Sequence, residues 1–224
     1  MAGGAPPTAP GATSWSCRPT PTAPDAARCD DPGSPLRTPP TTRWARPRSS
    51  SHELHMLCYL LLGAGNETTR NLITHGLLGL TRNPAQQERL REGRDLKLAV
   101  EELLRWVSPL VHQARTVTTD AEVAGCHLAP GDQVVMLYGA ANRDERVFGE
   151  TAEELDVTRD PNPHLAFGFG EHFCLGAALA RVEARVLFDE LVDRLGHWSV
   201  VGPDERLRST MIRGIKRLPV VLAP

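Results

Sequence analysis

The chain contains 224 residues, and its 25 Lys and Arg against 27 Asp and Glu give a formal net charge of −2. That length predicts one medium-sized domain or slightly more, while the balanced charge argues against nucleic acid or an anionic membrane as a partner. The five cysteines form no C-x-x-C pair, and the most apolar run (57–62) is too short to span a bilayer, so we expect a soluble cytoplasmic protein.

Residues 1–50 differ in composition from the rest of the chain. They contain eleven of the nineteen prolines and a single bulky aliphatic residue, Leu36. Such a segment buries too little apolar surface to offset the entropy of ordering it, so we expect it to be disordered. Its Pro, Ala and Thr bias also fits a flexible linker. Our preferred hypothesis is that it is GC-rich coding sequence translated out of frame, ahead of a folded domain at residues 51–224.

The first helix is predicted to begin after Ser50. Ser50 and Glu53 have the spacing of a capping box, in which each side chain bonds the other residue's backbone N–H group. A helical pattern then runs to about Thr81 and stops at Asn83-Pro84, because proline cannot continue a helix.

A local opening of this helix is predicted at Ala64–Thr69, which reads A-G-N-E-T-T. Gly63 and Gly65 each cost about 1 kcal/mol relative to alanine in a helix interior, and Thr68 can donate its hydroxyl to the carbonyl four residues back. Such openings are often functional sites. The residues alone also fit an ordinary helix in which Glu67 is a solvated side chain.

Shorter helices and strands are predicted after Pro84, from hydrophobic periodicity and from glycine and proline signals. The remaining predicted elements are helices at 84–91, 98–107 and 175–195, strands between 113 and 137, and short edge strands at 198–201 and 218–222.

Two sets of charged residues stand out between residues 98 and 137. Glu102 and Arg105 stand three residues apart and can pair on one face of a helix. Arg115 opens the strand region. From the residues alone, both features also fit ordinary surface charges.

The ten residues from Phe167 to Gly176, F-G-F-G-E-H-F-C-L-G, are the most informative in the chain. They place Cys174 on a glycine-rich loop just before the last helix, where the N–H groups of the first turn and the helix dipole stabilise a thiolate. Three phenylalanines supply apolar bulk, and Gly168, Gly170 and Gly176 permit the close approach of a large flat ligand. This combination indicates a thiolate that ligates iron beneath a haem plane. The simpler alternative is a buried free cysteine.

This loop resembles the haem-binding signature of the cytochrome P450 monooxygenases, F-G-x-G-x-H-x-C-x-G, at every fixed position. The order of motifs along residues 51–224 resembles the C-terminal half of the soluble bacterial members. The resemblance implies a mainly α fold with small β-sheets: a distal helix, an E-x-x-R helix, β hairpins, the cysteine loop and a proximal helix. It also implies that the family's N-terminal half is missing, which would leave apolar helix surface exposed.

The resemblance implies a role for each motif. Cys174 matches the axial iron ligand, and Glu67 and Thr68 match an acid–alcohol pair that delivers protons on the oxygen-binding face. Glu102, Arg105 and Arg159 match a buried ion cluster with a structural role. The other positions that match haem contacts are His172 and Arg115 at the propionates, and Phe167, Gly168, Gly176, Ala64 and Gly65.

By the same resemblance the cofactor is haem b, and the reaction inserts one atom of O2 into a small apolar organic substrate. Electrons would come from NAD(P)H through a ferredoxin reductase and a ferredoxin. Two alternatives stay open. One is an inactive haem-binding or misfolded remnant, and the other is a haem-thiolate peroxygenase that needs no electron partner.

Overall fold

The computed structural model describes residues 49–93, 95–195 and 197–223. Residues 1–48, which carry nearly all of the segment predicted to be disordered or out of frame, lie outside this range. The described helices are α1 (Ser51–Arg82), α2 (Pro84–Gly93), α3 (Leu96–Val107), α4 (Tyr138–Ala141), α5 (Glu145–Phe148), the 3-10 helix η1 (Gly170–His172) and α6 (Ala177–Leu195). The described strands are β1 (Gln113–Thr116), β2 (Ala121–Val123), β3 (Cys126–Leu128), β4 (Gln133–Met136), β5 (His197–Val200), β6 (Glu205–Arg206), β7 (Ile215–Arg217) and β8 (Val220–Ala223).

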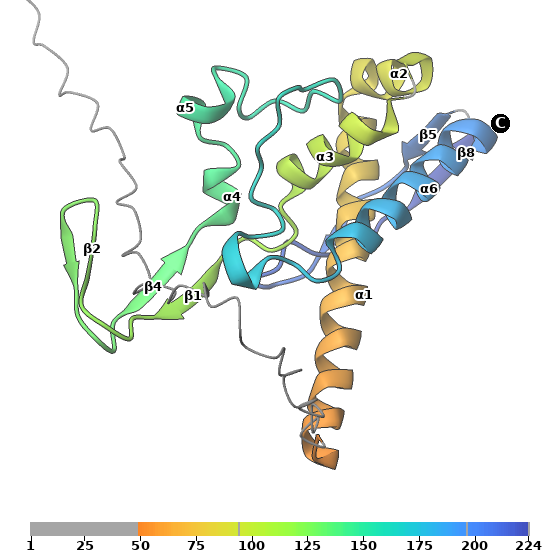
Figure 1. The fold of residues 1–224 in the computed structure, drawn as a ribbon. Coiled ribbons are helices and arrows are strands. Elements are labelled where there is room, and N and C mark those ends of the chain that lie inside the picture. Colours follow the sequence, from red (N-terminus) through yellow and green to blue (C-terminus); the bar gives the residue numbers. More distant parts are fainter. Residues whose placement is uncertain (1–48, 94, 196, 224) are drawn as a thin grey trace, which may run out of the picture. The chain divides into compact units, whose positions relative to one another are not determined.

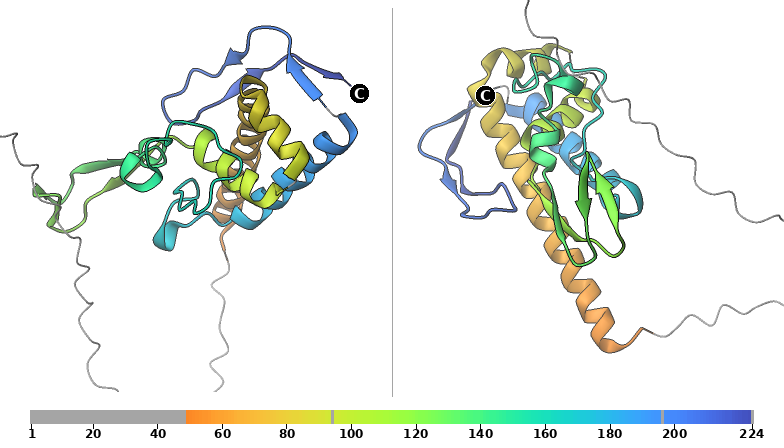
Figure 2. Two further views of the ribbon diagram at one scale, coloured as in Figure 1. Left: turned by 90° about the horizontal axis from the view of Figure 1, so that it is seen from above. Right: turned by 90° about the vertical axis from the view of Figure 1, so that its left-hand side faces the viewer.

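The fold is mainly helical with small sheets, as predicted (Figure 1). The strands form four antiparallel pairs, β1–β4, β2–β3, β5–β8 and β6–β7. The two predicted edge strands near the C-terminus therefore pair with each other. Figure 2 shows β1–β4 and β5–β8 on different sides of the helices.

The predicted capping box at the start of α1 is confirmed. The Ser50 hydroxyl accepts from the Glu53 N–H at 3.2 Å, and a Glu53 carboxylate oxygen accepts from the Ser50 N–H at 2.7 Å. At the other end, Asn83 donates its side-chain amide to the Gly79 carbonyl at 2.8 Å, and Pro84 begins the next helix. These local bonds satisfy backbone groups that a helix end leaves without partners.

The predicted opening of α1 is wrong, because the helix is continuous from Ser51 to Arg82. The Thr68 hydroxyl does donate to the Ala64 carbonyl, at 2.7 Å, but this bond adds to the backbone ladder without interrupting it. No atom lies within 4 Å of where a Cβ would stand at Gly63 or Gly65. The described chain therefore places nothing against this turn that could pull its backbone apart, and helix cooperativity outweighs the propensity cost of two glycines.

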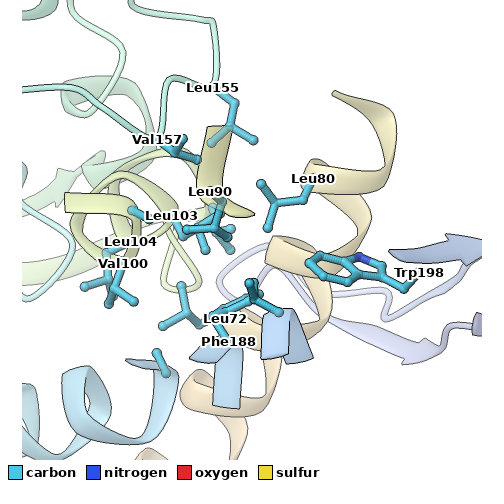
Figure 3. Packing of buried hydrophobic residues seen from close by; sticks show 14 residues of the cluster. Leu72, Leu80, Leu90, Val100, Leu103, Leu104, Leu155, Val157, Phe188 and Trp198 are labelled. Carbon is cyan, nitrogen blue, oxygen red and sulfur yellow. The ribbon is translucent and has the colours of Figure 1, made fainter. Parts of the chain in front are cut away.

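The core lies where α1, α3 and α6 meet (Figure 3). Leu72 of α1, Leu103 of α3 and Phe188 of α6 are almost completely buried there. Glycines on α1 allow this close packing. A Cβ at Gly76 would lie 2.9 Å from the Phe188 ring, and one at Gly79 would lie 2.7 Å from the Trp106 ring.

The first half of α1, residues 51–66, is exposed along its whole length (Figure 1). Its exposed apolar side chains are Leu54, Met56, Leu57, Tyr59, Leu60, Leu61 and Leu62. The resemblance implied exposed apolar helix surface, without indicating where it lies. None of the described helices combines the length and apolarity that crossing a membrane requires.

Candidate haem-thiolate site

The loop that carries Cys174 is held by its own backbone. The Cys174 N–H donates to the Phe167 carbonyl at 2.9 Å, which closes the loop. Gly168 and Gly170 have φ values of +75° and +71°, so both stand in the left-handed region that favours glycine. The Cys174 carbonyl accepts from the Ala177 N–H, the first residue of α6, at 3.2 Å. The cysteine therefore lies just before a helix N-terminus, as predicted.

The Cys174 thiol is free and exposed. A Cβ at Gly176 would lie 4.0 Å from its Sγ atom, so the glycine keeps the space beside the sulfur clear. The apolar side chains of the loop also face solvent: Phe169 is 85% exposed, Phe173 51% and Leu175 91%. The described residues thus present a thiol surrounded by open apolar surface, which rules out the buried free cysteine considered above.

Phe167 is the aromatic residue that ties this loop to the core. Its ring packs edge-on against Phe173, with centroids 6.2 Å apart, and the Arg181 guanidinium lies 4.5 Å from its centroid. Arg181 also forms two hydrogen bonds to the Glu101 carboxylate, at 2.6 and 2.9 Å. The Phe167 ring of the loop therefore packs against the Arg181 guanidinium, which Glu101 of α3 holds in place.

Glu101 also accepts from His164 at 2.9 Å. Burial raises the pKa of this carboxyl, but the hydrogen bonds from His164 and Arg181 outweigh burial and lower the pKa to about 2. Sequence reasoning missed the Glu101–Arg181 pair, because the two residues are 80 positions apart and neither belongs to a recognisable motif.

The two residues expected at the propionates lie in different surroundings. His172 is exposed and 3.6 Å from the Glu171 carboxylate. Arg115 is half-buried on β1 and donates to the Gln113 side chain at 3.2 Å and to the Ala114 carbonyl at 3.0 Å. Among the described residues it has no carboxylate partner, so its charge is available to an anionic group.

On α1, Glu67 and Thr68 each already have a partner. Glu67 forms an ion pair with Arg70 at 2.7 Å and accepts from Asn71 at 3.2 Å. The Thr68 hydroxyl hydrogen is used by the Ala64 carbonyl. Ala64 and Gly65 are exposed, and nothing lies within 4 Å of a Cβ built at Gly65.

Glu102, Arg105 and Arg159 come together in a buried cluster. Arg105 donates to both oxygens of Glu102 at 2.7 Å, and the two side chains are fully buried. The Arg159 Nε atom lies 3.2 Å from a Glu102 oxygen. The remaining donors of Arg105 reach backbone carbonyls at 2.6 to 2.7 Å, those of Asn142, Ala152 and Glu154.

This cluster connects α3 to the segment that precedes the cysteine loop. Asn162 donates to Glu102 at 3.0 Å. Further on, the Leu165 N–H donates to the Asn142 side chain at 2.7 Å, and Asn142 donates to Ser108 at 2.9 Å. The position of the loop is therefore set by a buried polar network, in which Asn142 is a member whose contacts no sequence spacing indicates.

The resemblance implies haem, and three observations on the described residues fit that group. The thiol of Cys174 is exposed beside a glycine. Apolar side chains of the loop face solvent, as contact with a porphyrin face requires. Arg115 supplies a cation without an acidic partner, which suits a propionate. A thiolate donor among apolar side chains is the chemistry of a haem ligand.

Comparison with known proteins identifies the family. A sequence model described as Cytochrome P450 matches residues 45–200. The methyl-branched lipid omega-hydroxylase of Mycobacterium bovis is 49% identical over 176 residues, which cover 77% of this chain and 41% of that protein. The steroid C26-monooxygenase of Rhodococcus jostii is 44% identical over 172 residues, which cover 76% of this chain and 36% of that protein.

Solved structures agree with this result. CYP109E1 from Bacillus megaterium, in complex with testosterone, is 38% identical with a TM-score of 0.73, and the match covers 78% of this chain and 49% of that one. The chain thus spans less than half the length of these three proteins. The extent of the family match and its agreement in three dimensions show that the chain belongs to the cytochrome P450 family.

Proposed function

We propose that this chain carries the thiolate-ligand half of a haem monooxygenase. Haem b would be held by Cys174, with His172 and Arg115 available to its propionates and with Phe167, Gly168 and Gly176 beside the thiolate. Once bound, the haem supplies the activation of O2 and the insertion of one oxygen atom into a C–H bond. The observation that carries the proposal is the exposed Cys174 thiol on a closed loop directly before a helix N-terminus.

Thr68 and Glu67 are the residues that we propose to move protons. With its hydrogen on the Ala64 carbonyl, the Thr68 hydroxyl can accept a proton-bearing partner but cannot donate. It must therefore rotate away from Ala64 to pass a hydrogen on. Glu67 is restrained by Arg70 and Asn71, so its carboxylate must leave these partners before it can exchange a proton.

The substrate that we propose is a small apolar organic molecule. Two relatives named for their substrates act on a methyl-branched lipid and on a steroid, both largely apolar. Electrons come from NAD(P)H through a ferredoxin reductase and a ferredoxin that docks on the cysteine side. Lys97, Glu101, Arg181 and Arg185 line a hollow on that side. Glu101 pairs with Arg181, so Lys97 and Arg185 are the cations left to attract an acidic partner.

The exposed apolar half of α1 favours a second candidate, an inactive remnant that binds haem loosely or misfolds. Seven large apolar side chains within residues 54–62 are more than half exposed, and such surface promotes aggregation. The two candidates differ in one measurable property, which is stable uptake of haem through a thiolate.

Expressing the full chain with haem supplied, and recording the spectrum of its reduced carbon-monoxide adduct, tests the proposal. We expect a thiolate-type Soret band in the parent and its loss in Cys174→Ser. Absence of haem uptake by the parent would support the inactive remnant, and an unchanged spectrum in the serine variant would refute the assignment of Cys174. Product formation that requires NAD(P)H and redox proteins supports the monooxygenase, while turnover with peroxide alone supports the peroxygenase alternative.

A further inference from the structure

A second polar site lies away from the cysteine loop, in a cavity of about 220 Å³. Its polar lining consists of His75, Arg82, Arg206 and Arg213, and the Trp106 ring forms part of its wall. His75 and Arg82 belong to α1 and Arg206 belongs to β6, while Arg213 lies in the irregular segment before β7. None of these residues takes part in the proposed haem chemistry.

His75 has one ring nitrogen without a partner. The residue is 4% exposed, and its Nδ1 atom lies 3.0 Å from the Asn71 carbonyl. Because a carbonyl oxygen can only accept, Nδ1 carries the hydrogen and Nε2 carries a lone pair. The Nε2 atom is buried with no hydrogen-bond partner among the described residues. An unsatisfied buried acceptor is costly, so a bound molecule that donates a hydrogen bond to this atom would be stabilised.

The cavity also has uncompensated positive charge. Arg82 and Arg206 share the carboxylate of Asp204, at 3.2 and 2.7 Å. The guanidinium of Arg213 is half-buried and has neither a hydrogen bond nor an ion pair among the described residues. The Glu153 carboxylate acts on it only at longer range, since it is paired with Arg143 at 3.1 Å. Three guanidinium groups therefore face one carboxylate.

The pKa values of His75 and Arg213 show which charges a ligand of the cavity would meet. Burial, together with the charges of Arg206 and Arg213, lowers the pKa of His75 to about 4, so the ring is neutral around pH 7. Burial and the neighbouring Arg143 and Arg206 also lower the pKa of Arg213, as expected for a cation that lacks a counter-ion. A ligand that satisfies the cavity must bring negative charge for the arginines and a hydrogen for the histidine.

We infer that this cavity binds a phosphate group that retains one proton. The charged oxygens of the phosphate accept hydrogen bonds from Arg213 and from the other two arginines of the cavity, because guanidinium geometry matches phosphate oxygens. Its P–O–H group donates to Nε2 of His75. Sulfate offers the same charge and shape but carries no hydrogen at neutral pH, and chloride offers only charge. The cavity therefore selects phosphate over sulfate.

Calorimetric titration of the full chain at neutral pH and constant ionic strength tests this inference. We expect inorganic phosphate to bind at least about tenfold more tightly than sulfate, because a site built for a hydroxyl hydrogen discriminates against a ligand without one. Glycerol 3-phosphate, titrated separately, distinguishes the two sources of such a group. Weaker binding than phosphate supports the free ion, and tighter binding supports a phosphate carried by a larger molecule.

Arg213→Gln should weaken phosphate binding by about tenfold or more, since it removes a charge-assisted hydrogen bond. It removes no side-chain hydrogen bond or ion pair found among the described residues, so the variant should keep the parent's circular dichroism spectrum. Arg208→Gln is the matched control, because Arg208 is an exposed arginine of the same segment outside the cavity lining, and it should bind like the parent. No detectable phosphate binding, equal binding of sulfate, or equal effects of the two substitutions would overturn the inference.

Discussion

Replacing Glu102 with glutamine tests whether the buried cluster holds the site's scaffold. The substitution preserves the size of the side chain but removes the charge that two arginines face. Arg105 is fully buried, and the Arg159 side chain is 9% exposed, so neither cation can recover its solvation in water. The new amide group would also direct N–H donors at the N–H groups of Arg105 or Asn162.

The expected loss of stability follows from these contacts. Glu102 accepts two charge-assisted bonds from Arg105 at 2.7 Å and one from the Asp156 N–H at 2.9 Å. Removing one partner of a buried ion pair costs about 3–5 kcal/mol, because a charge is left buried without compensation. For a domain of this size that corresponds to a fall in Tm of about 6–20 °C.

Urea unfolding followed by far-ultraviolet circular dichroism measures this effect. Glu88→Gln is the matched control, since Glu88 pairs with Arg91 at the same i, i+3 spacing and 2.9 Å, but its side chain is 45% exposed. That exposed pair should contribute only about 0–1 kcal/mol. If Glu102→Gln is no more destabilising than Glu88→Gln, the cluster does not have the structural role argued here.

Three further predictions use the same unfolding measurement. Gly79→Ala places a Cβ 2.7 Å from the Trp106 ring and should lower the free energy of unfolding by about 1–3 kcal/mol. Gly65→Ala places a Cβ with nothing within 4 Å and should raise that free energy by about 1 kcal/mol. Equal effects of the two substitutions would contradict the packing. The lowered pKa of Glu101, about 2 when folded, gives stability that is present above about pH 4.5 and lost as the pH falls towards 2, so Glu101→Gln should flatten the pH dependence there. The pKa of His75 is about 4 in the folded chain, so the unfolded chain takes up a proton first as the pH falls. The free energy of unfolding should therefore decrease as the pH is lowered from about 6.5 to 4 in phosphate-free buffer. The decrease should be smaller in His75→Gln.

Features fixed by neighbouring residues could be predicted from the sequence. The capping box at Ser50 and the helix stop at Pro84 depend on contacts within four residues, and both are present. The loop around Cys174 was located by its glycines and its place before a helix. The pairing of Glu102 with Arg105 follows from helix geometry alone, whereas its complete burial was inferred only from the resemblance.

Contacts between distant segments were not predictable in this way. The hydrogen-bond partners of the Asn142 side chain are residues 108 and 165, and His75 shares its cavity with Arg213, 138 positions later. No periodicity or spacing in the sequence encodes such pairs. The predicted opening near Gly65 failed for a related reason. Local propensity was weighed without the continuous hydrogen-bond ladder of a 32-residue helix, which outweighs it.

The residues of the buried cluster and the residues proposed to contact haem differ in burial, and this difference has a consequence for experiment. Glu102 and Arg105 find their hydrogen-bond partners within the described chain, so their contribution is already present before haem binds. Cys174 and His172 face solvent, and their contribution to the folded state depends on what binds there. Loss of the Cys174 thiol should therefore leave unfolding in urea unchanged while it abolishes thiolate-type haem binding. Loss of the Glu102 charge should reduce both the free energy of unfolding and haem binding, because the buried network sets the position of the loop that carries the sulfur.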